Sequence, residues 1–160
     1  MLEAAIIEWE RHQDIAPGVV AAMVQVEAGG ECAAFRPEEG YPWLYDIVRG
    51  PIRSAAPDVY LTPIKGETSR AELWGQRISW GPLQLMGATA RELGFRGWFP
   101  ELCGPKGIEY GVRYLAKLYL RHGSWDDAIA AYNAGKPRTT PSGQYVNQKY
   151  VDKVRKHWRR

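Results

Sequence analysis

The sequence predicts a mainly α-helical single domain over residues 1–160, with one long insertion at residues 31–78. Three observations support this fold class. Apolar residues recur with helical spacing on both sides of the insertion, prolines interrupt the insertion itself, and the length suits one domain that buries its own core. We expect the insertion to be a long loop or to contain a short hairpin, and loops of this length are often functional.

Two helices are predicted before the insertion. Residues 2–12 carry apolar groups on one helical face. Asp14 then precedes a second helix that has Pro17 in its first turn and continues through residues 19–27. Gly29 and Gly30 follow, and paired glycines are a strong helix-end signal.

Four helical segments are predicted after the insertion. The first begins near Ser79 and ends at Gly94, and the second spans about residues 108–119 and ends at Gly123. Ser124 and Asp127 resemble a capping box that opens the third segment, which ends at Gly135. The last helix holds an apolar stripe made of Val146, Tyr150, Val151 and Val154.

Composition excludes several function classes. A net charge of +3 is too mild to indicate nucleic-acid binding, and no nucleic-acid-binding motif is present. Cys32 and Cys103 have neither metal-site nor multi-disulfide spacing, so they either pair with each other or stay free. The three histidines lack ligand spacing too, and we expect no metal and no cofactor.

Glu27 is the carboxylate with the most suggestive position. It shares a helical face with Val20, Met23 and Val24, one turn before the glycine stop. Desolvation and the negative end of the helix dipole both raise the pKa of a carboxyl group in such a place. A carboxylic acid that stays protonated near neutral pH suits glycosidic cleavage. Spacing alone, however, favours a helix-end Glu that bends into solvent.

Three sequence segments favour a functional Glu27 over a solvent-exposed one. Residues 24–30 (VQVEAGG), residues 79–90 (SWGPLQLMGATA) and residues 130–135 (AAYNAG), the last followed by Tyr150-Val151, occur in this order. They resemble the lytic transglycosylase family, whose fold is similar to goose-type lysozyme. The resemblance implies a lysozyme-like domain that cuts bacterial peptidoglycan at the β-1,4 bond between N-acetylmuramic acid and N-acetylglucosamine.

The resemblance also implies roles for the matched positions. Glu27 would protonate the glycosidic oxygen and then take the proton of the sugar's C6 hydroxyl, so that a 1,6-anhydro ring closes without water. Tyr132 would place its hydroxyl near Glu27 or the substrate. Five further residues would line or hold the sugar site: Ser79, Gln84, Met86, Asn133 and Tyr150. Packing or capping roles fit several of these residues as well.

The insertion keeps a hydrolytic alternative open. Goose-type lysozymes carry extra carboxylates in this stretch, and an inverting hydrolase needs a second carboxylate about 6.5–9.5 Å from the first. The candidates are Asp46, Asp58, Glu67 and Glu72, with Asp46 preferred because it follows an aromatic run. We favour the non-hydrolytic route, with a hydrolytic muramidase close behind and a non-catalytic wall-binding module as the rival of another class.

Context adds further expectations. The first residues include Glu3 and Glu8 and lack the pattern of a signal peptide. We therefore expect a bacteriophage lysis enzyme made in the host cytoplasm, which reaches the wall after holin-type release or from the virion. We expect it to be a monomer that binds glycan strands and no nucleic acid. A basic C-terminal end could hold anionic wall or outer-membrane surfaces, although a solvated helix explains it as well: Lys149, Lys153, Arg155, Lys156, Arg159 and Arg160.

Overall fold

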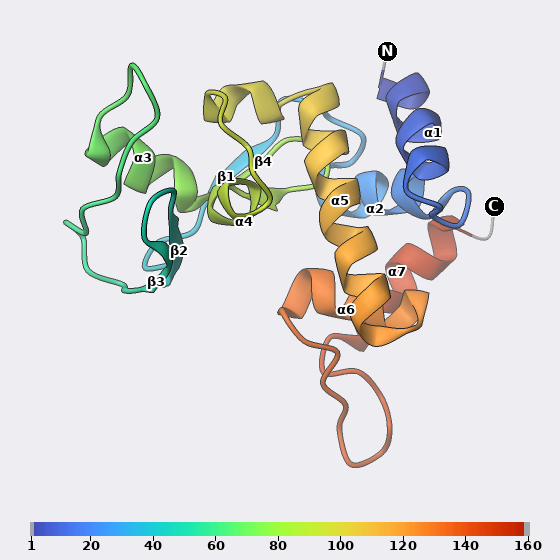
Figure 1. Cartoon of the computed structure of the whole chain (residues 1–160). Coiled ribbons are helices and arrows are strands. Elements are labelled where there is room, and N and C mark those ends of the chain that lie inside the picture. The colour runs from blue at the N-terminus through green and yellow to red at the C-terminus, as the bar shows by residue number, and fades with distance from the viewer. Residues whose placement is uncertain (1, 159–160) are drawn as a thin grey trace.

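Helices enclose the main core of the protein, as the sequence predicted. The computed structural model describes residues 2–158. Five helices form the helical body: α1 (Leu2–His12), α2 (Val19–Ala28), α5 (Pro105–His122), α6 (Trp125–Ala134) and α7 (Gln148–Trp158). The long helix α5 runs through this body, with α1 and α6 against it, and α2 packs chiefly on α7 (Figure 1). No helix among residues 2–158 combines the length and apolar character that crossing a bilayer requires.

The boundaries of α1, α5 and α6 confirm the sequence signals. The ends at Gly123 and Gly135 fall where expected, and the Ser124 hydroxyl accepts a hydrogen bond of 3.1 Å from the backbone N–H of Asp127. The last helix begins later than predicted. Val146 lies in the exposed loop before α7, whereas Val151 and Val154 are fully buried.

The start of α2 differs from the prediction, which placed Pro17 in the first turn. The helix begins at Val19, after Gly18 in the left-handed conformation. The carboxylate of Glu10, on α1, accepts hydrogen bonds from the backbone N–H groups of Gly18 at 3.0 Å and Val20 at 2.9 Å. A buried carboxyl group from another helix thus accepts the hydrogen bonds of backbone N–H groups that have no partner within the first turn of α2.

The insertion contains the predicted hairpin and one helix that was not predicted. The hairpin pairs β2 (Trp43–Asp46) with β3 (Gly50–Arg53). The helix is α3 (Ser69–Gln76), and the Thr68 side chain caps it by accepting a hydrogen bond from Ala71. Figure 1 shows α3, β2 and β3 grouped to one side of the helical body, beyond α4 (Gly87–Glu92).

The segment after Ser79 was wrongly predicted to be helical from its start. Residues 78–86 form β4 (Ile78–Trp80), a turn and β5 (Leu85–Met86), and β4 also pairs with β1 (Phe35–Pro37). The turn depends on Gly81, whose φ is +71°, because a Cβ there would lie 1.9 Å from the carbonyl oxygen of Leu102. Apolar residues of a buried strand and turn imitate helical spacing over so short a stretch. A 3₁₀ turn, η1 (Phe99–Leu102), then leads into α5.

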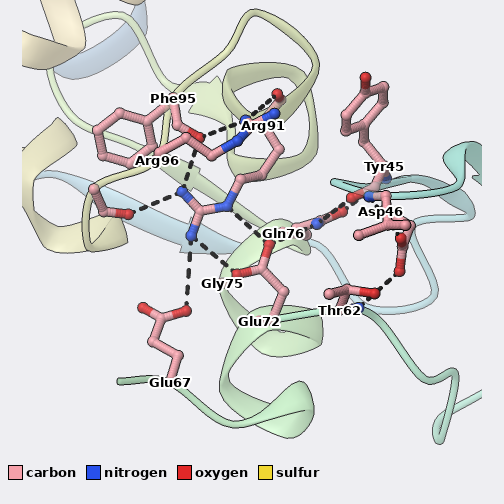
Figure 2. A network of polar contacts seen from close by, with 12 residues as sticks. Tyr45, Asp46, Thr62, Glu67, Glu72, Gly75, Gln76, Arg91, Phe95 and Arg96 are labelled. Carbon is pink, nitrogen blue, oxygen red and sulfur yellow. Dashed lines mark hydrogen bonds and ion pairs between the residues drawn. The ribbon is translucent and has the colours of Figure 1, made fainter. Parts of the chain in front are cut away.

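A buried polar network joins the hairpin and α3 of the insertion to α4 (Figure 2). Arg91 of α4 is fully buried and donates to Glu72 of α3 at 2.8 and 2.9 Å. Gln76 of α3 donates to the carbonyl of Tyr45 at 2.6 Å and accepts from its N–H at 2.8 Å. The amide contact thus holds the hairpin on α3, and the ion pair joins α3 to α4. A small apolar cluster of Leu44, Leu61 and Leu73 adds to the packing of the hairpin on α3.

Candidate active site

Glu27 lies in the last turn of α2, where the sequence predicted it. Val20, Met23 and Val24 of the same face are buried in the helical core. Gly29 ends the helix in the left-handed conformation, and its N–H bonds to the carbonyl of Gln25 at 3.2 Å. The chain thus turns away after Glu27, which leaves its carboxyl group partly buried at the helix end.

The Glu27 carboxylate receives a short hydrogen bond from Tyr150 of α7. The phenol oxygen lies 2.5 Å from Oε1 of Glu27, and the close packing of α2 on α7 brings them together. Burial raises the pKa of Glu27, while the Tyr150 hydrogen bond and the charge of Arg36 lower it in part. Burial and the negative charge of Glu27 raise the pKa of Tyr150 in turn, so Tyr150 is the proton donor in this contact.

A cavity of about 250 Å³ opens beside Glu27, and we call it the Glu27 cavity. It brings together six residues that the sequence singled out, from α2, the β4–β5 region and α6. Three more come from β1 and the loop after it. The nine lining residues are Glu27, Arg36, Glu38, Tyr41, Ser79, Gln84, Met86, Tyr132 and Asn133.

Tyr132 and Tyr150 have different partners. The Tyr132 hydroxyl donates to the carbonyl of Leu83 at 2.9 Å, whereas Tyr150 contacts Glu27 directly. Burial raises the pKa of Tyr132, and the charge of Glu27 adds to the shift. Tyr132 therefore holds the β4–β5 turn and presents its ring to the Glu27 cavity, and its hydroxyl is already engaged.

Gln84 closes the turn between β4 and β5 with its side chain. Its amide nitrogen donates to the carbonyls of Gly81 at 2.9 Å and Ala34 at 3.2 Å. Its amide oxygen accepts from the Ser79 hydroxyl at 3.0 Å. Ser79 is itself buried, so it orients Gln84 more than it faces the cavity. Among residues 2–158, the Gln84 oxygen accepts this one hydrogen bond, and its second lone pair could accept another from a ligand.

Asn133 connects α6 to the long loop that precedes α7. Its side-chain oxygen accepts a hydrogen bond of 2.9 Å from the amide of Asn147, which also donates to the carbonyl of Ala130. Met86, on β5, lines the cavity without a polar contact. These two residues and Tyr132 form one wall of the cavity from segments about fifty residues apart in the sequence.

Asp46 does not lie in the Glu27 cavity. It is fully buried at the hairpin turn and accepts hydrogen bonds from the N–H groups of Val48, Arg49 and Thr62 and from the Arg49 guanidinium. Figure 2 shows it beside Thr62. Although burial opposes ionisation, these hydrogen bonds hold the pKa of Asp46 well below its ordinary value. Such a carboxylate organises the turn and has no free lone pair directed at a water molecule.

The other proposed second carboxylates are also absent from the lining of the cavity. Glu72 is committed to Arg91, Glu67 lies 3.7 Å from the same guanidinium, and Asp58 is exposed. The second carboxylate that does line it is Glu38, which sequence reasoning missed. Glu38 accepts a hydrogen bond of 2.6 Å from Arg36.

No sequence pattern marked Arg36, Glu38 and Tyr41 as site residues. They occupy the proline-interrupted stretch for which the sequence predicts a loop. The pairing of β1 with β4 places Arg36 opposite Ser79, and Glu38 and Tyr41 follow in the loop after β1. Burial raises the pKa of Tyr41, and the charges of Glu92 and Glu38 add to the shift.

Two further groups of residues that the sequence singled out lie outside the lining of the Glu27 cavity. Among residues 2–158, no three His, Cys, Asp or Glu side chains are placed to hold a metal ion, and Cys32 and Cys103 are free thiols. In the basic C-terminal end, Arg155 is paired with Asp126, while Arg159 and Arg160 lie outside the described residues.

Comparison with known proteins identifies the domain type. Residues 4–154 match a family model described as Transglycosylase SLT domain. No curated protein and no solved structure matches the chain. The matched range runs from α1 into α7 and therefore includes both Glu27 and Tyr150.

Proposed function

The chain belongs to the transglycosylase SLT domain family, a family of peptidoglycan lytic transglycosylases, and we propose that Glu27 is the acid and base of its reaction. The observation that carries this proposal is the setting of the Glu27 carboxyl group. Burial desolvates this group and raises its pKa, and the group lines the Glu27 cavity. One of its oxygens also accepts a hydrogen bond of 2.5 Å from the Tyr150 hydroxyl. A general acid needs such a raised pKa.

In the first step, protonated Glu27 gives its proton to the oxygen that links N-acetylmuramic acid to N-acetylglucosamine. The bond between that oxygen and C1 of the muramic acid breaks, and the bonding electrons leave with the oxygen. Glu27 becomes a carboxylate, and the hydrogen bond from Tyr150 stabilises this charged form. Tyr150 thus favours release of the proton.

In the second step, the Glu27 carboxylate takes the proton of the C6 hydroxyl of the same muramic acid. The C6 oxygen bonds to C1 and closes a 1,6-anhydro ring, which restores protonated Glu27 without consuming water. The wall formed by Met86, Tyr132 and Asn133 would hold the sugar over Glu27, and the free lone pair of Gln84 would accept a hydrogen bond from it.

One observation favours hydrolysis as the second candidate. Glu38 lines the Glu27 cavity, so a second carboxylate faces the same space. In a hydrolytic muramidase, Glu38 would activate a water molecule that attacks C1 while Glu27 protonates the leaving oxygen. The hydrogen bond of 2.6 Å from Arg36 would orient the Glu38 carboxyl group for that role.

Digestion of purified peptidoglycan in ¹⁸O-labelled water separates these routes. The transglycosylase proposal expects muropeptides with 1,6-anhydro ends and no label. A hydrolase would give reducing ends that carry ¹⁸O at C1. In that case, Glu38→Gln should abolish label incorporation, and Asp46→Asn, which alters a buried carboxyl group bound in the hairpin turn, should not. No released product from folded wild type would leave a wall-binding module and contradict the proposal.

A further inference from the structure

The Glu27 cavity continues into two neighbouring cavities. A central cavity of about 310 Å³ shares Tyr41, Gln84, Met86, Tyr132 and Asn133 with it. A hairpin cavity of about 230 Å³ shares Tyr41, Trp43 and Thr89 with the central one. Because neighbouring cavities share lining residues, they lie side by side, and we call the row of three cavities from Glu27 to the β2–β3 hairpin the groove.

The far end of this groove carries an exposed aromatic ring. Trp43, at the start of β2, is 56% exposed although it is among the largest apolar side chains of the insertion. Its register partner across the hairpin is Arg53, whose guanidinium carbon lies 4.5 Å from the centre of the Trp43 ring. This cation–π contact holds the ring on one side, while the ring still lines both the central and the hairpin cavity.

The hairpin that carries this pair is anchored firmly. Tyr45, two residues after Trp43, exchanges two hydrogen bonds with Gln76, which donates to Glu72 at 2.8 Å. Glu72 is in turn paired with the buried Arg91 of α4, the helix that forms the other wall of the hairpin cavity (Figure 2). The pair is therefore fixed relative to the groove before any ligand arrives, which reduces the entropy cost of binding.

Charge at this end of the groove is positive on balance. Arg53 makes no ion pair within the described part of the chain. Glu92 also lines the hairpin cavity, but its carboxylate is paired with Lys117 at 2.8 Å. A ligand with an apolar ring face and a nearby carboxylate fits both partners, because an aromatic ring packs on the C–H face of a sugar and a guanidinium binds a carboxylate through two N–H groups.

We propose that Trp43 and Arg53 form a distal subsite for an N-acetylmuramoyl residue that still carries its stem peptide. The sugar ring lies on Trp43, and a carboxylate of the peptide binds Arg53. This inference rests on the proposed function and goes beyond it, because it assigns a substrate preference to the insertion: long, peptide-bearing strands bind along the whole groove, and short strands do not reach its end.

The test compares four variants on three substrates. The variants are Trp43→Ala, Trp43→Phe and Arg53→Gln, with Trp74→Ala as the matched control because Trp74 is 57% exposed and lines none of the three cavities. The substrates are long peptide-bearing strands, the same strands freed of peptide by an amidase, and a muramyl tetrasaccharide. The readout is kcat and KM for release of muropeptides or sugars, with melting temperatures measured alongside.

We expect Trp43→Ala to raise KM on both kinds of long strand about five- to tenfold, with kcat and tetrasaccharide turnover unchanged. Trp43→Phe should retain most of the affinity, Trp74→Ala should match wild type, and Arg53→Gln should raise KM only on peptide-bearing strands. The inference would be overturned if Trp43→Ala and Trp74→Ala changed KM on long strands equally, or if Trp43→Ala impaired tetrasaccharide turnover as much as turnover of long strands. In either case, an active wild type would still support the proposed function. An inactive wild type would overturn both.

Discussion

The hydroxyl of Tyr150 donates a hydrogen bond of 2.5 Å to Oε1 of Glu27 and so joins the first turn of α7 to the last turn of α2. The two residues are 123 positions apart in the sequence. The contact stabilises the charged form of Glu27, whereas burial of the same group stabilises the neutral form. In the proposed reaction, the balance between these opposed effects on the pKa of Glu27 would set the pH range in which Glu27 acts as an acid.

Replacing Tyr150 by Phe should shift that range. The hydrogen bond lowers the pKa of Glu27, so its removal should raise this pKa further and keep the acid protonated to higher pH. We expect the alkaline limb of the kcat profile to move to higher pH, with kcat at the optimum reduced by about tenfold or less. A pH–rate profile on soluble glycan strands measures both effects. An alkaline limb that stays in place or moves to lower pH would contradict the assigned role of Tyr150.

Asp46→Asn should lower stability rather than change the reaction. Asp46 holds the hairpin turn with four hydrogen bonds, and its pKa lies below the ordinary value of 3.8. Its stabilising contribution is therefore present above about pH 4 and is lost as the pH falls below it. We expect a loss of about 1–3 kcal/mol in the free energy of unfolding at pH 7 and a kcat close to wild type for the folded enzyme.

Denaturant unfolding, together with kcat measured well below the transition, checks this prediction. Asp58→Asn is a suitable control because Asp58 is an exposed carboxylate of the same insertion. The prediction is wrong if Asp46→Asn folds as stably as wild type and yet loses activity, because Asp46 would then take part in the chemistry.

Glu67 should make stability depend on pH near neutrality. Burial, the hydrogen bond to Glu72 and the charge of Glu72 raise its pKa from 4.5 to about 7, against the opposing effect of Arg91. A raised folded-state pKa means that the contribution is fully present below about pH 4.5 and is lost as the pH rises through about 7. Glu67→Gln should remove this part of the pH dependence.

Melting temperatures of wild type and Glu67→Gln between pH 5 and pH 8 provide the measurement. From pH 5 to pH 8, the melting temperature of the wild type should fall further than that of the variant, by about 2–4 °C for each kcal/mol of lost unfolding free energy. Glu72→Gln is the contrasting variant, because it removes the carboxylate that lies 2.8 Å from the buried Arg91 guanidinium and should cost about 3–5 kcal/mol at both ends of this pH interval. Parallel melting curves for wild type and Glu67→Gln would contradict the assignment.

Local signals in the sequence predicted much of the fold. The spacing of Val20, Met23, Val24 and Glu27 predicted one helical face, and glycines predicted the ends of α2, α5 and α6. These features depend on residues within one or two turns of each other, so periodicity and capping rules detect them. The hydrolytic candidate Asp46 was chosen from its aromatic neighbours, which carry no information on where the hairpin lies relative to Glu27.

Long-range contacts explain what the sequence did not predict. Glu10 caps α2 from another helix, Gly81 is required by the carbonyl of Leu102, and Glu38 reaches the Glu27 cavity through the pairing of β1 with β4. Each contact depends on the tertiary arrangement, which propensity does not encode. The helix α3 differs from these cases, because a local signal was present: Thr68 at its start is an ordinary N-cap residue. The prolines of the insertion led to the prediction of a loop there instead.

The most direct test of the account compares Glu27→Gln with Glu31→Gln, an exposed carboxylate four positions further along the chain. The rate of release of anhydro-ended muropeptides from purified peptidoglycan is measured for both variants and for wild type. Loss of the general acid should reduce this rate by about 10²–10⁴-fold in Glu27→Gln, with its melting temperature equal to or above that of wild type because a desolvated acid is removed. Glu31→Gln should match wild type. A Glu27→Gln variant that still releases anhydro-ended products at close to the wild-type rate would contradict the central claim.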